Sequence, residues 1–213
     1  MSRFETEDEQ VEAIKSWWKK NGTALLTVIL VVVVAISGWR YWQNSEFVES
    51  ANASATFEVL QSRSLQGSFG DVARDALKLM NENPESPYAA AAALLHAKYD
   101  FEKGEIEQAQ TNLQWVIDHA TSEELKAIAQ IRMARLLAQQ SKLDDAQAIL
   151  AKIPRDAEDS ALSADIDYLQ GLIALSKQEL TQAQTAFQSV IDNPNTDDNL
   201  RGLAEIQLAD IAQ

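Results

Sequence analysis

An uncharged stretch of 19 residues near the N-terminus constrains this chain more than any other feature. Residues 21–39 read NGTALLTVILVVVVAISGW, and the middle of the stretch, residues 25–36, is almost entirely Leu, Ile and Val. A helix of this length extends about 28 Å at 1.5 Å per residue, and the hydrocarbon core of a bilayer is about 30 Å thick. The sequence therefore predicts one membrane-spanning helix, which we place at residues 21–42.

Aromatic and basic residues bracket the predicted span. Indole and phenol rings favour the headgroup layer of a membrane, and long basic side chains reach toward it. We expect eight residues to anchor the helix at the two membrane surfaces: Trp17, Trp18, Lys19, Lys20, Trp39, Arg40, Tyr41 and Trp42.

Two alternatives compete with a membrane anchor. A buried core helix would have no use for aromatic and basic residues at both ends. A cleaved signal peptide is the stronger alternative, because Ala35, Ile36 and Ser37 resemble a small-residue cleavage site. The segment before the stretch is long and acidic, however, which is atypical of a signal peptide and favours an anchor that is retained.

The distribution of basic residues predicts the orientation of the span. The N-terminal flank carries four basic residues, whereas the C-terminal flank carries Arg40 and then none before Arg63. Basic flanks stay in the cytoplasm. Residues 1–42 have no net charge, so the formal charge of −14 lies in residues 43–213. We expect a single-pass protein of a bacterial inner membrane, with a cytoplasmic N-terminus and an acidic periplasmic domain.

Residues 43–213 contain a pattern that recurs with a period of 37 residues. A first column of small residues is Ala97, Ala134 and Gly171, and a second, 12 residues later, is Ala109, Ala146 and Ala183. Between them lies a turn column of Gly104, Ser141 and Gln178. A column of large apolar residues follows at Leu113, Leu150 and Phe187. The four prolines, Pro84, Pro87, Pro154 and Pro194, fall where a unit should end and the next begin.

The pattern predicts an all-α chain of stacked helical hairpins. Small residues on two helices joined by a short turn allow close approach, and the large residues fill the space between successive hairpins. A weaker unit precedes, with its first helix in residues 51–65, and residues 198–211 should form a capping helix. The expected parts are a cytosolic tail (1–20), the span (21–42), a juxtamembrane helical region (43–65) and an α-solenoid (66–213).

Residues typical of catalysis are scarce. The chain has no cysteine and carries only His96 and His119, and it lacks the common nucleophile, phosphate-binding and metalloprotease motifs. The acidic segment 192–198 does not follow the calcium-loop pattern, so a solvated connection is the better interpretation. We therefore expect no enzyme activity, no cofactor and no metal site. The negative charge disfavours nucleic acid as a partner.

The repeat columns resemble the tetratricopeptide repeat, although the period is 37 rather than 34 residues and the early Trp is absent. The order of segments is more specific. FETEDEQVEAIKSWWKKNG at 4–22, the span, GWRYWQ at 38–43 and an acidic Ala-rich repeat domain resemble the YfgM family of ancillary SecYEG translocon subunits. This resemblance implies a periplasmic tetratricopeptide-like domain that associates with SecYEG and with the periplasmic folding factor PpiD.

In tetratricopeptide arrays the first helix of each hairpin lines a concave groove. Carried over to this chain, the candidate partner groove comprises Leu94, Lys98, Phe101, Ile131, Arg135, Tyr168 and Leu172. Apolar contacts would hold a peptide segment and the two cations would bind a carboxylate; alternatively, these cations are ordinary solvated residues. Two functions stay open: a scaffold that links export at the translocon to periplasmic folding factors, and a chaperone-like module that binds unfolded exported polypeptides.

Overall fold

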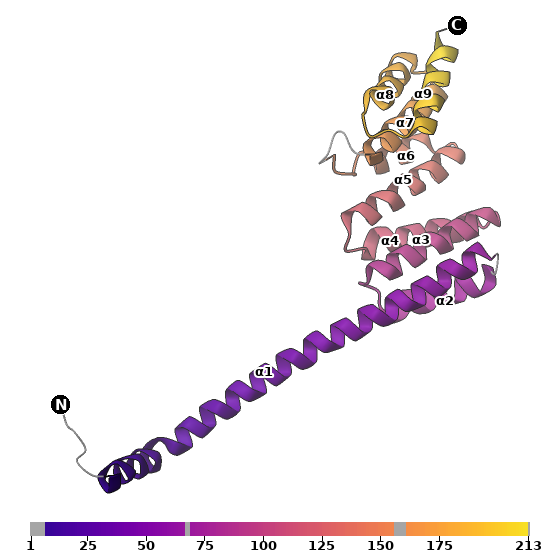
Figure 1. The fold of residues 1–213 in the computed structure, drawn as a ribbon. Coiled ribbons are helices and arrows are strands. Elements are labelled where there is room, and N and C mark those ends of the chain that lie inside the picture. The colour runs from indigo at the N-terminus through magenta and orange to yellow at the C-terminus, as the bar shows by residue number, and fades with distance from the viewer. Residues whose placement is uncertain (1–6, 67–68, 156–160, 213) are drawn as a thin grey trace. The chain divides into compact units, whose positions relative to one another are not determined.

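The computed structural model describes residues 7–66, 69–155 and 161–212, and every regular element in these ranges is an α-helix (Figure 1). The helices are α1 (Glu7–Leu65), α2 (Phe69–Glu82), α3 (Pro87–Glu102), α4 (Ile106–His119), α5 (Glu123–Gln139), α6 (Leu143–Leu150), α7 (Ala161–Ser176), α8 (Leu180–Asp192) and α9 (Asp198–Ile211). The predicted all-α class is confirmed. The chain separates into two compact units, Met1–Ala51 and Asn52–Gln213.

The first unit contains the apolar part of α1. Residues Ile14–Tyr41 are long and apolar enough to cross a membrane. Side chains along this stretch are exposed, including those of Leu30 and Val34 in its middle. Trp17, Trp18, Trp39 and Tyr41 are all at least half exposed, whereas the side chain of Trp42 lies outside the described residues. The exposure argues against the core-helix alternative, because a core helix would be covered by other elements.

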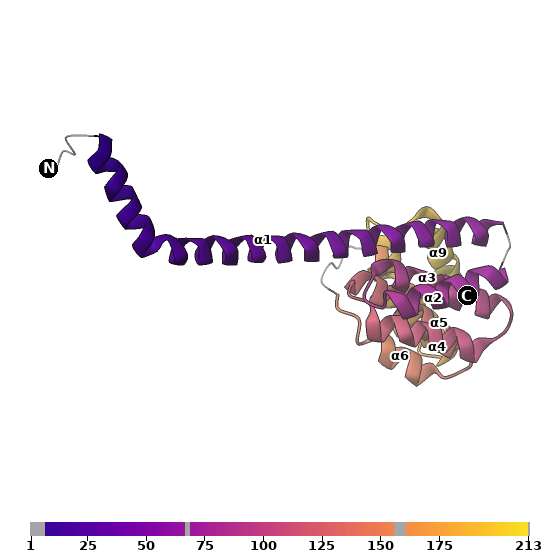
Figure 2. The ribbon, with the colours of Figure 1, turned by 90° about the horizontal axis from the view of Figure 1, so that it is seen from below.

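The second unit is a stack of helical hairpins. Consecutive helices from α2 to α6 and from α6 to α9 pack against each other in chain order (Figures 1 and 2). In addition α3 contacts α5, α5 contacts α7, and α7 contacts α9. First helices thus touch first helices, which is the contact pattern of an α-solenoid. The last helix, α9, occupies the position of a further first helix and has the predicted bounds of the cap.

The three turns of the 37-residue pattern share one backbone conformation. Gly104, Ser141 and Gln178 have φ of 80°, 62° and 64°, in the left-handed region. In each turn the amide of the next residue donates to a carbonyl five residues earlier: Glu105 to Asp100 (2.8 Å), Lys142 to Leu137 (2.9 Å) and Glu179 to Ala174 (2.8 Å). These bonds satisfy carbonyls at the ends of α3, α5 and α7. The predicted turn column is confirmed.

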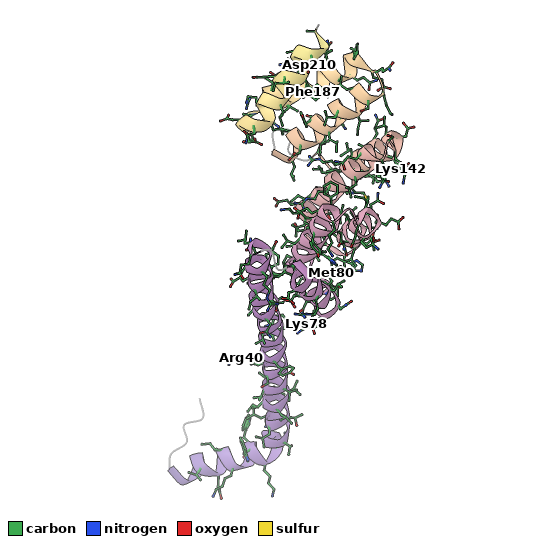
Figure 3. All side chains as sticks on the ribbon, turned by 90° about the vertical axis from the view of Figure 1, so that its right-hand side faces the viewer. Arg40, Lys78, Met80, Lys142, Phe187 and Asp210 are labelled. Carbon is green, nitrogen blue, oxygen red and sulfur yellow. The ribbon has the colours of Figure 1, made fainter. Side chains whose placement is uncertain are left out.

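Small and large residues interlock within each hairpin. Ala109, Ala146 and Ala183 are fully buried, as is Phe187, whose position is labelled in Figure 3. Gly171 of α7 leaves room for this ring, because a Cβ at position 171 would lie 2.5 Å from Phe187. Close helix approach therefore depends on the small-residue columns, as the sequence predicts.

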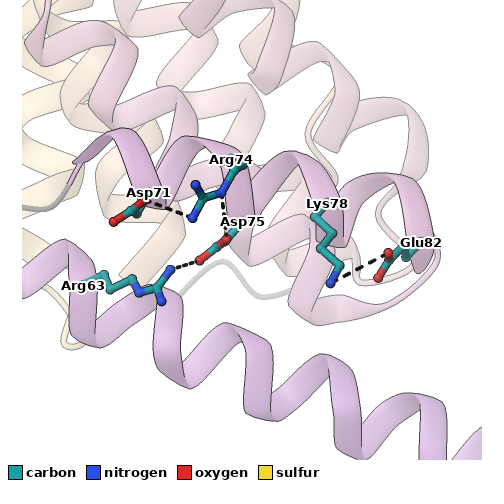
Figure 4. A network of polar contacts seen from close by, with 6 residues as sticks. All are labelled: Arg63, Asp71, Arg74, Asp75, Lys78 and Glu82. Atoms are coloured by element: carbon teal, nitrogen blue, oxygen red, sulfur yellow. Dashed lines mark hydrogen bonds and ion pairs between the residues drawn. The ribbon is translucent and has the colours of Figure 1, made fainter.

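The C-terminal part of α1 forms the first helix of the solenoid. Ala53 and Leu60 are buried in one cluster with Val72, Ala76 and Leu79 of α2. Arg63 of α1 also pairs with Asp75 of α2, and neighbouring Arg74 pairs with Asp71 at 2.9 Å (Figure 4). Residues 52–65 of α1 and helix α2 thus form an N-terminal hairpin, which precedes the three hairpins of the 37-residue pattern, α3–α4, α5–α6 and α7–α8.

Candidate partner-binding groove

A pocket of about 270 Å³ lies between the neighbouring first helices α3 and α5. It brings together three of the predicted groove residues, Lys98, Phe101 and Arg135. We call the whole set the basic pocket: Ala97, Lys98, Phe101, Leu113, Arg132, Arg135, Leu136 and Gln139.

Helical periodicity explains which side chains meet here. Four of the lining residues come from α5 at spacings of three and four, which is one stripe of an α-helix: Arg132, Arg135, Leu136 and Gln139. Lys98 and Phe101 are likewise three residues apart on α3. Because α3 and α5 are adjacent first helices, the two stripes face a common space.

The base of the pocket is apolar and well packed. Ala97, Leu113 and Leu136 are buried members of the core cluster that joins α3, α4 and α5. Phe101, in contrast, is 41% exposed. Phe101 therefore exposes apolar surface at the pocket, whereas the buried residues only shape it.

The three cations of the pocket differ in their partners. Lys98 Nζ lies 3.7 Å from Glu102 and Arg135 lies 3.9 Å from Asp165, and all four side chains are substantially exposed. Such pairs stabilise little and exchange easily. In the described ranges no ion pair reaches Arg132, which donates to the Leu94 carbonyl at 3.3 Å.

Arg132 is the cation best placed to bind an anion. Loss of hydration lowers the pKa of Arg132, and the charge of Arg135 lowers it further. Two like charges held together, one of them without a carboxylate, favour an incoming anion. Sequence reasoning missed Arg132, although its position three residues before Arg135 on one helix was an available signal.

Four predicted groove residues lie elsewhere. Leu94 and Ile131 are only 6% and 5% exposed and belong to the core, so they present almost no surface to a partner. Tyr168 and Leu172 of α7 pack against the C-terminal core, where the Tyr168 ring lies 5.6 Å from that of Phe187. Three of the seven predicted groove residues therefore line this pocket, and the other four do not.

The two histidines lie in different environments. His96 is buried beside Asp100, with Nε2 3.5 Å from Oδ1, and the amide of Asn112 donates to the other oxygen of Asp100 at 2.7 Å. His119 is exposed and stacks on Trp115 with ring centroids 4.6 Å apart. Among the described residues, no three His, Asp or Glu side chains converge on a common metal-binding point.

The acidic segment before α9 is a helix cap. Asp197 accepts a hydrogen bond from the Leu200 amide at 3.0 Å, and Thr196 donates to the Val190 carbonyl at 2.7 Å. Asn193 and Thr196 are buried, so the connection is less solvated than the sequence predicted. The Asp197 carboxylate therefore caps the N-terminus of α9.

The known proteins that resemble this chain point to one family. A family model described as a tetratricopeptide repeat-like domain matches residues 15–213. The chain is 31% identical over 196 residues to an ancillary SecYEG translocon subunit of Escherichia coli, covering 92% of each chain. It is 28% identical over 181 residues to the protein of that name from Haemophilus influenzae, covering 84% of this chain and 88% of the relative. No solved structure matches.

Proposed function

Since the chain belongs to the family of ancillary SecYEG translocon subunits with a tetratricopeptide repeat-like domain, we propose that it is a non-enzymatic adaptor at the translocon. The apolar part of α1 anchors it in the inner membrane, with its N-terminus in the cytoplasm. The repeat unit lies in the periplasm and holds a folding factor of the PpiD type close to SecYEG. The eight flanking aromatic and basic residues fix the depth of the anchor.

The basic pocket is the observation that carries the adaptor role. Two guanidinium groups and one ammonium surround an opening beside an exposed phenylalanine. A carboxylate can accept two parallel hydrogen bonds from one guanidinium. An acidic partner segment with a neighbouring apolar side chain therefore fits the pocket: the carboxylate meets Arg132 and Arg135, and the apolar group contacts Phe101.

Chemical crosslinking and affinity recovery from detergent-solubilised membranes test the adaptor. The full-length protein should recover both the translocon and a PpiD-type factor. Arg132→Glu with Arg135→Glu should reduce recovery of the folding factor at least tenfold, because two charges at the pocket are reversed. Lys152→Glu, an exposed cation outside the pocket, is the control and should change nothing. Failure of the intact protein to recover translocon subunits would overturn the proposal.

The exposure of Phe101 favours a second candidate function, the direct binding of unfolded exported chains. A chaperone-like module should suppress aggregation of a reduced, unfolded model protein when the full-length chain is added. Phe101→Ala should weaken that effect. If the protein neither suppresses aggregation nor binds unfolded peptides, and Arg135→Glu leaves partner recovery unchanged, this second function is excluded.

A further inference from the structure

A second and larger hollow lies on a different face of α5, along α4 and α6. Its volume is about 770 Å³. It shares no residue with the basic pocket, although α5 contributes to both. We call it the acidic groove, and it is lined by Glu107, Gln110, Thr111, Gln114, Trp115, Asp118, His119, Met133, Leu137, Asp145 and Ile149.

The floor of the acidic groove is apolar. Trp115, Leu137 and Ile149 are partly buried side chains that pack against the core, and Met133 is a member of that core. The Trp115 ring is held in place by its stack on His119, with 10° between the ring planes. His119 is itself fixed, since its Nδ1 lies 2.9 Å from the Trp115 carbonyl. The floor is therefore a preformed apolar surface that includes the indole of Trp115.

The margin of the groove carries uncompensated negative charge. Glu107 and Asp118 stand at the two ends of α4, and Asp145 stands on α6 across the groove; all three are exposed. No Lys or Arg lines the groove. Within the described ranges, ion pairs reach the neighbouring Asp144, through Lys177, but none reaches these three carboxylates. Gln114 donates to Asp118 at 2.9 Å, which is the contact of a neutral donor.

The length of the acidic groove suits a short bound helix. Glu107 and Asp118 are 11 residues apart on α4, about 17 Å at the rise of an α-helix. That length matches about three turns of a bound amphipathic helix. Helices of this kind place an apolar face in a groove and a charged face at its margin.

Charge decides which occupant fits. Residues 43–213 hold 27 acidic and 13 basic residues, so the repeat unit of a second copy would meet the groove with like charge. Anionic lipid headgroups and nucleic acid are disfavoured for the same reason. A cationic, amphipathic protein segment is favoured, because its Lys and Arg side chains would supply the partners that the three carboxylates lack.

We propose that the acidic groove binds a basic amphipathic helix of a partner protein. Apolar side chains of the helix pack on Trp115, Leu137 and Ile149, and its cations lie between Glu107, Asp118 and Asp145. This inference does not depend on the basic pocket, which selects the opposite charge. One repeat unit thus carries two docking surfaces of opposite electrostatic preference.

Binding of designed peptides to the full-length protein in zwitterionic nanodiscs tests the inference. The probe is a fluorescent 14-residue amphipathic helix of Lys, Leu and Ala, and its anisotropy is measured against empty nanodiscs. We expect saturable binding that weakens at high salt, because charge attraction is screened. A peptide with Glu in place of Lys, and one with Ala in place of Leu, should each bind at least tenfold more weakly.

Matched variants locate the binding. Glu107→Lys with Asp145→Lys should weaken binding at least tenfold. Glu205→Lys with Asp210→Lys makes the same charge change at exposed positions on α9 and should leave binding unchanged. Circular dichroism and the melting temperature verify that both double variants stay folded. Equal loss in the two variants, equal binding of the peptide without Leu, or no saturable binding would overturn the proposal. A dimer of the protein that Glu107→Lys with Asp145→Lys dissolves would also overturn it, since the occupant would then be a second copy.

Discussion

Of the three hairpins that follow the 37-residue pattern, the first, α3–α4, and the third, α7–α8, pack their two helices together with different residues. In the first, Ala97 on one helix faces a core that includes Leu113, and in the third, Gly171 makes room for Phe187. A smaller residue on one helix accompanies a larger one on the other. The comparison shows that the repeat specifies a combined volume and a turn, and leaves individual side chains free to change.

The two hairpins also differ in interior polarity. The hairpin α3–α4 buries three polar residues: His96, Asp100 and Asn112. At the equivalent positions, 74 residues later, the hairpin α7–α8 has Gln170, Ala174 and Ala186. The second hairpin is apolar there, with Met133, Leu137 and Ile149. A buried hydrogen-bonded carboxylate is therefore compatible with this fold but is not required by it. Each prediction below tests one of these differences and is measured as the free energy of urea unfolding of the full-length protein in detergent.

Removing the large residue of the third hairpin should have the largest effect. Phe187→Ala is expected to lower the free energy of unfolding by about 3–5 kcal/mol, since the ring is fully buried and its removal leaves a cavity. The double variant Phe187→Leu with Gly171→Ala imitates the first hairpin and should cost less than Phe187→Leu alone. Additive effects of the two substitutions would contradict the exchange of volume between α7 and α8.

Enlarging Gly171 while Phe187 stays in place should also destabilise the protein. Gly171→Ala alone is expected to cost about 1–3 kcal/mol, because its Cβ would meet the Phe187 ring at 2.5 Å. Gly202→Ala on α9 is the matched control. No atom lies within 4 Å of a Cβ there, so the better helix propensity of alanine should stabilise the protein by up to about 1 kcal/mol. If Gly171→Ala leaves the free energy of unfolding unchanged, the Phe187 ring can move aside.

The buried polar residues of the hairpin α3–α4 allow a test of whether apolar residues can replace them. Asp100→Leu should cost about 1–3 kcal/mol, because it leaves the buried Asn112 amide without its acceptor. The triple variant His96→Met, Asp100→Leu, Asn112→Ile copies the second hairpin and should recover most of that loss. If the triple variant is less stable than Asp100→Leu, the polar cluster stabilises the fold by more than its hydrogen bonds.

The turns should give the smallest effects. Gly104 pays no steric penalty at positive φ, whereas Gln178 does. Gln178→Gly is therefore expected to stabilise by about 0.5–1 kcal/mol, and Gly104→Ala to destabilise by about 1 kcal/mol. Unchanged stability in both variants would mean that the shared hydrogen bond of the turn, rather than residue type, dominates.

The fold was largely predictable because its signals are local. Turn residues and small-residue columns act within one hairpin, and the prolines mark where hairpins end, so a 37-residue period was enough to predict α3 to α8; the apolar pattern of residues 198–211 predicted α9. A helix at residues 51–65 was also predicted, and α1 continues to Leu65. Similar spacing in consecutive units compensated for the weak resemblance of any single repeat.

The candidate site was less predictable because it depends on which face of each helix is covered. Helix α3 is apolar on several sides, and periodicity did not separate the buried Leu94 from the exposed Phe101. Arg132 and the acidic groove were missed for a related reason. Both depend on side chains that neighbouring helices bring together, whereas the family pattern gives only positions on the first helix of each hairpin.

The stacked indole of Trp115 makes the fluorescence of the repeat unit a reporter of one place in the molecule. The other four tryptophans lie within residues 17–42, so Trp115 is the one indole in the sequence of residues 52–213. It lies in the acidic groove against His119. A ligand that covers the ring displaces water from it and shifts its emission to shorter wavelength. The difference spectrum between the full-length protein and its Trp115→Phe variant therefore isolates a label-free signal from this groove.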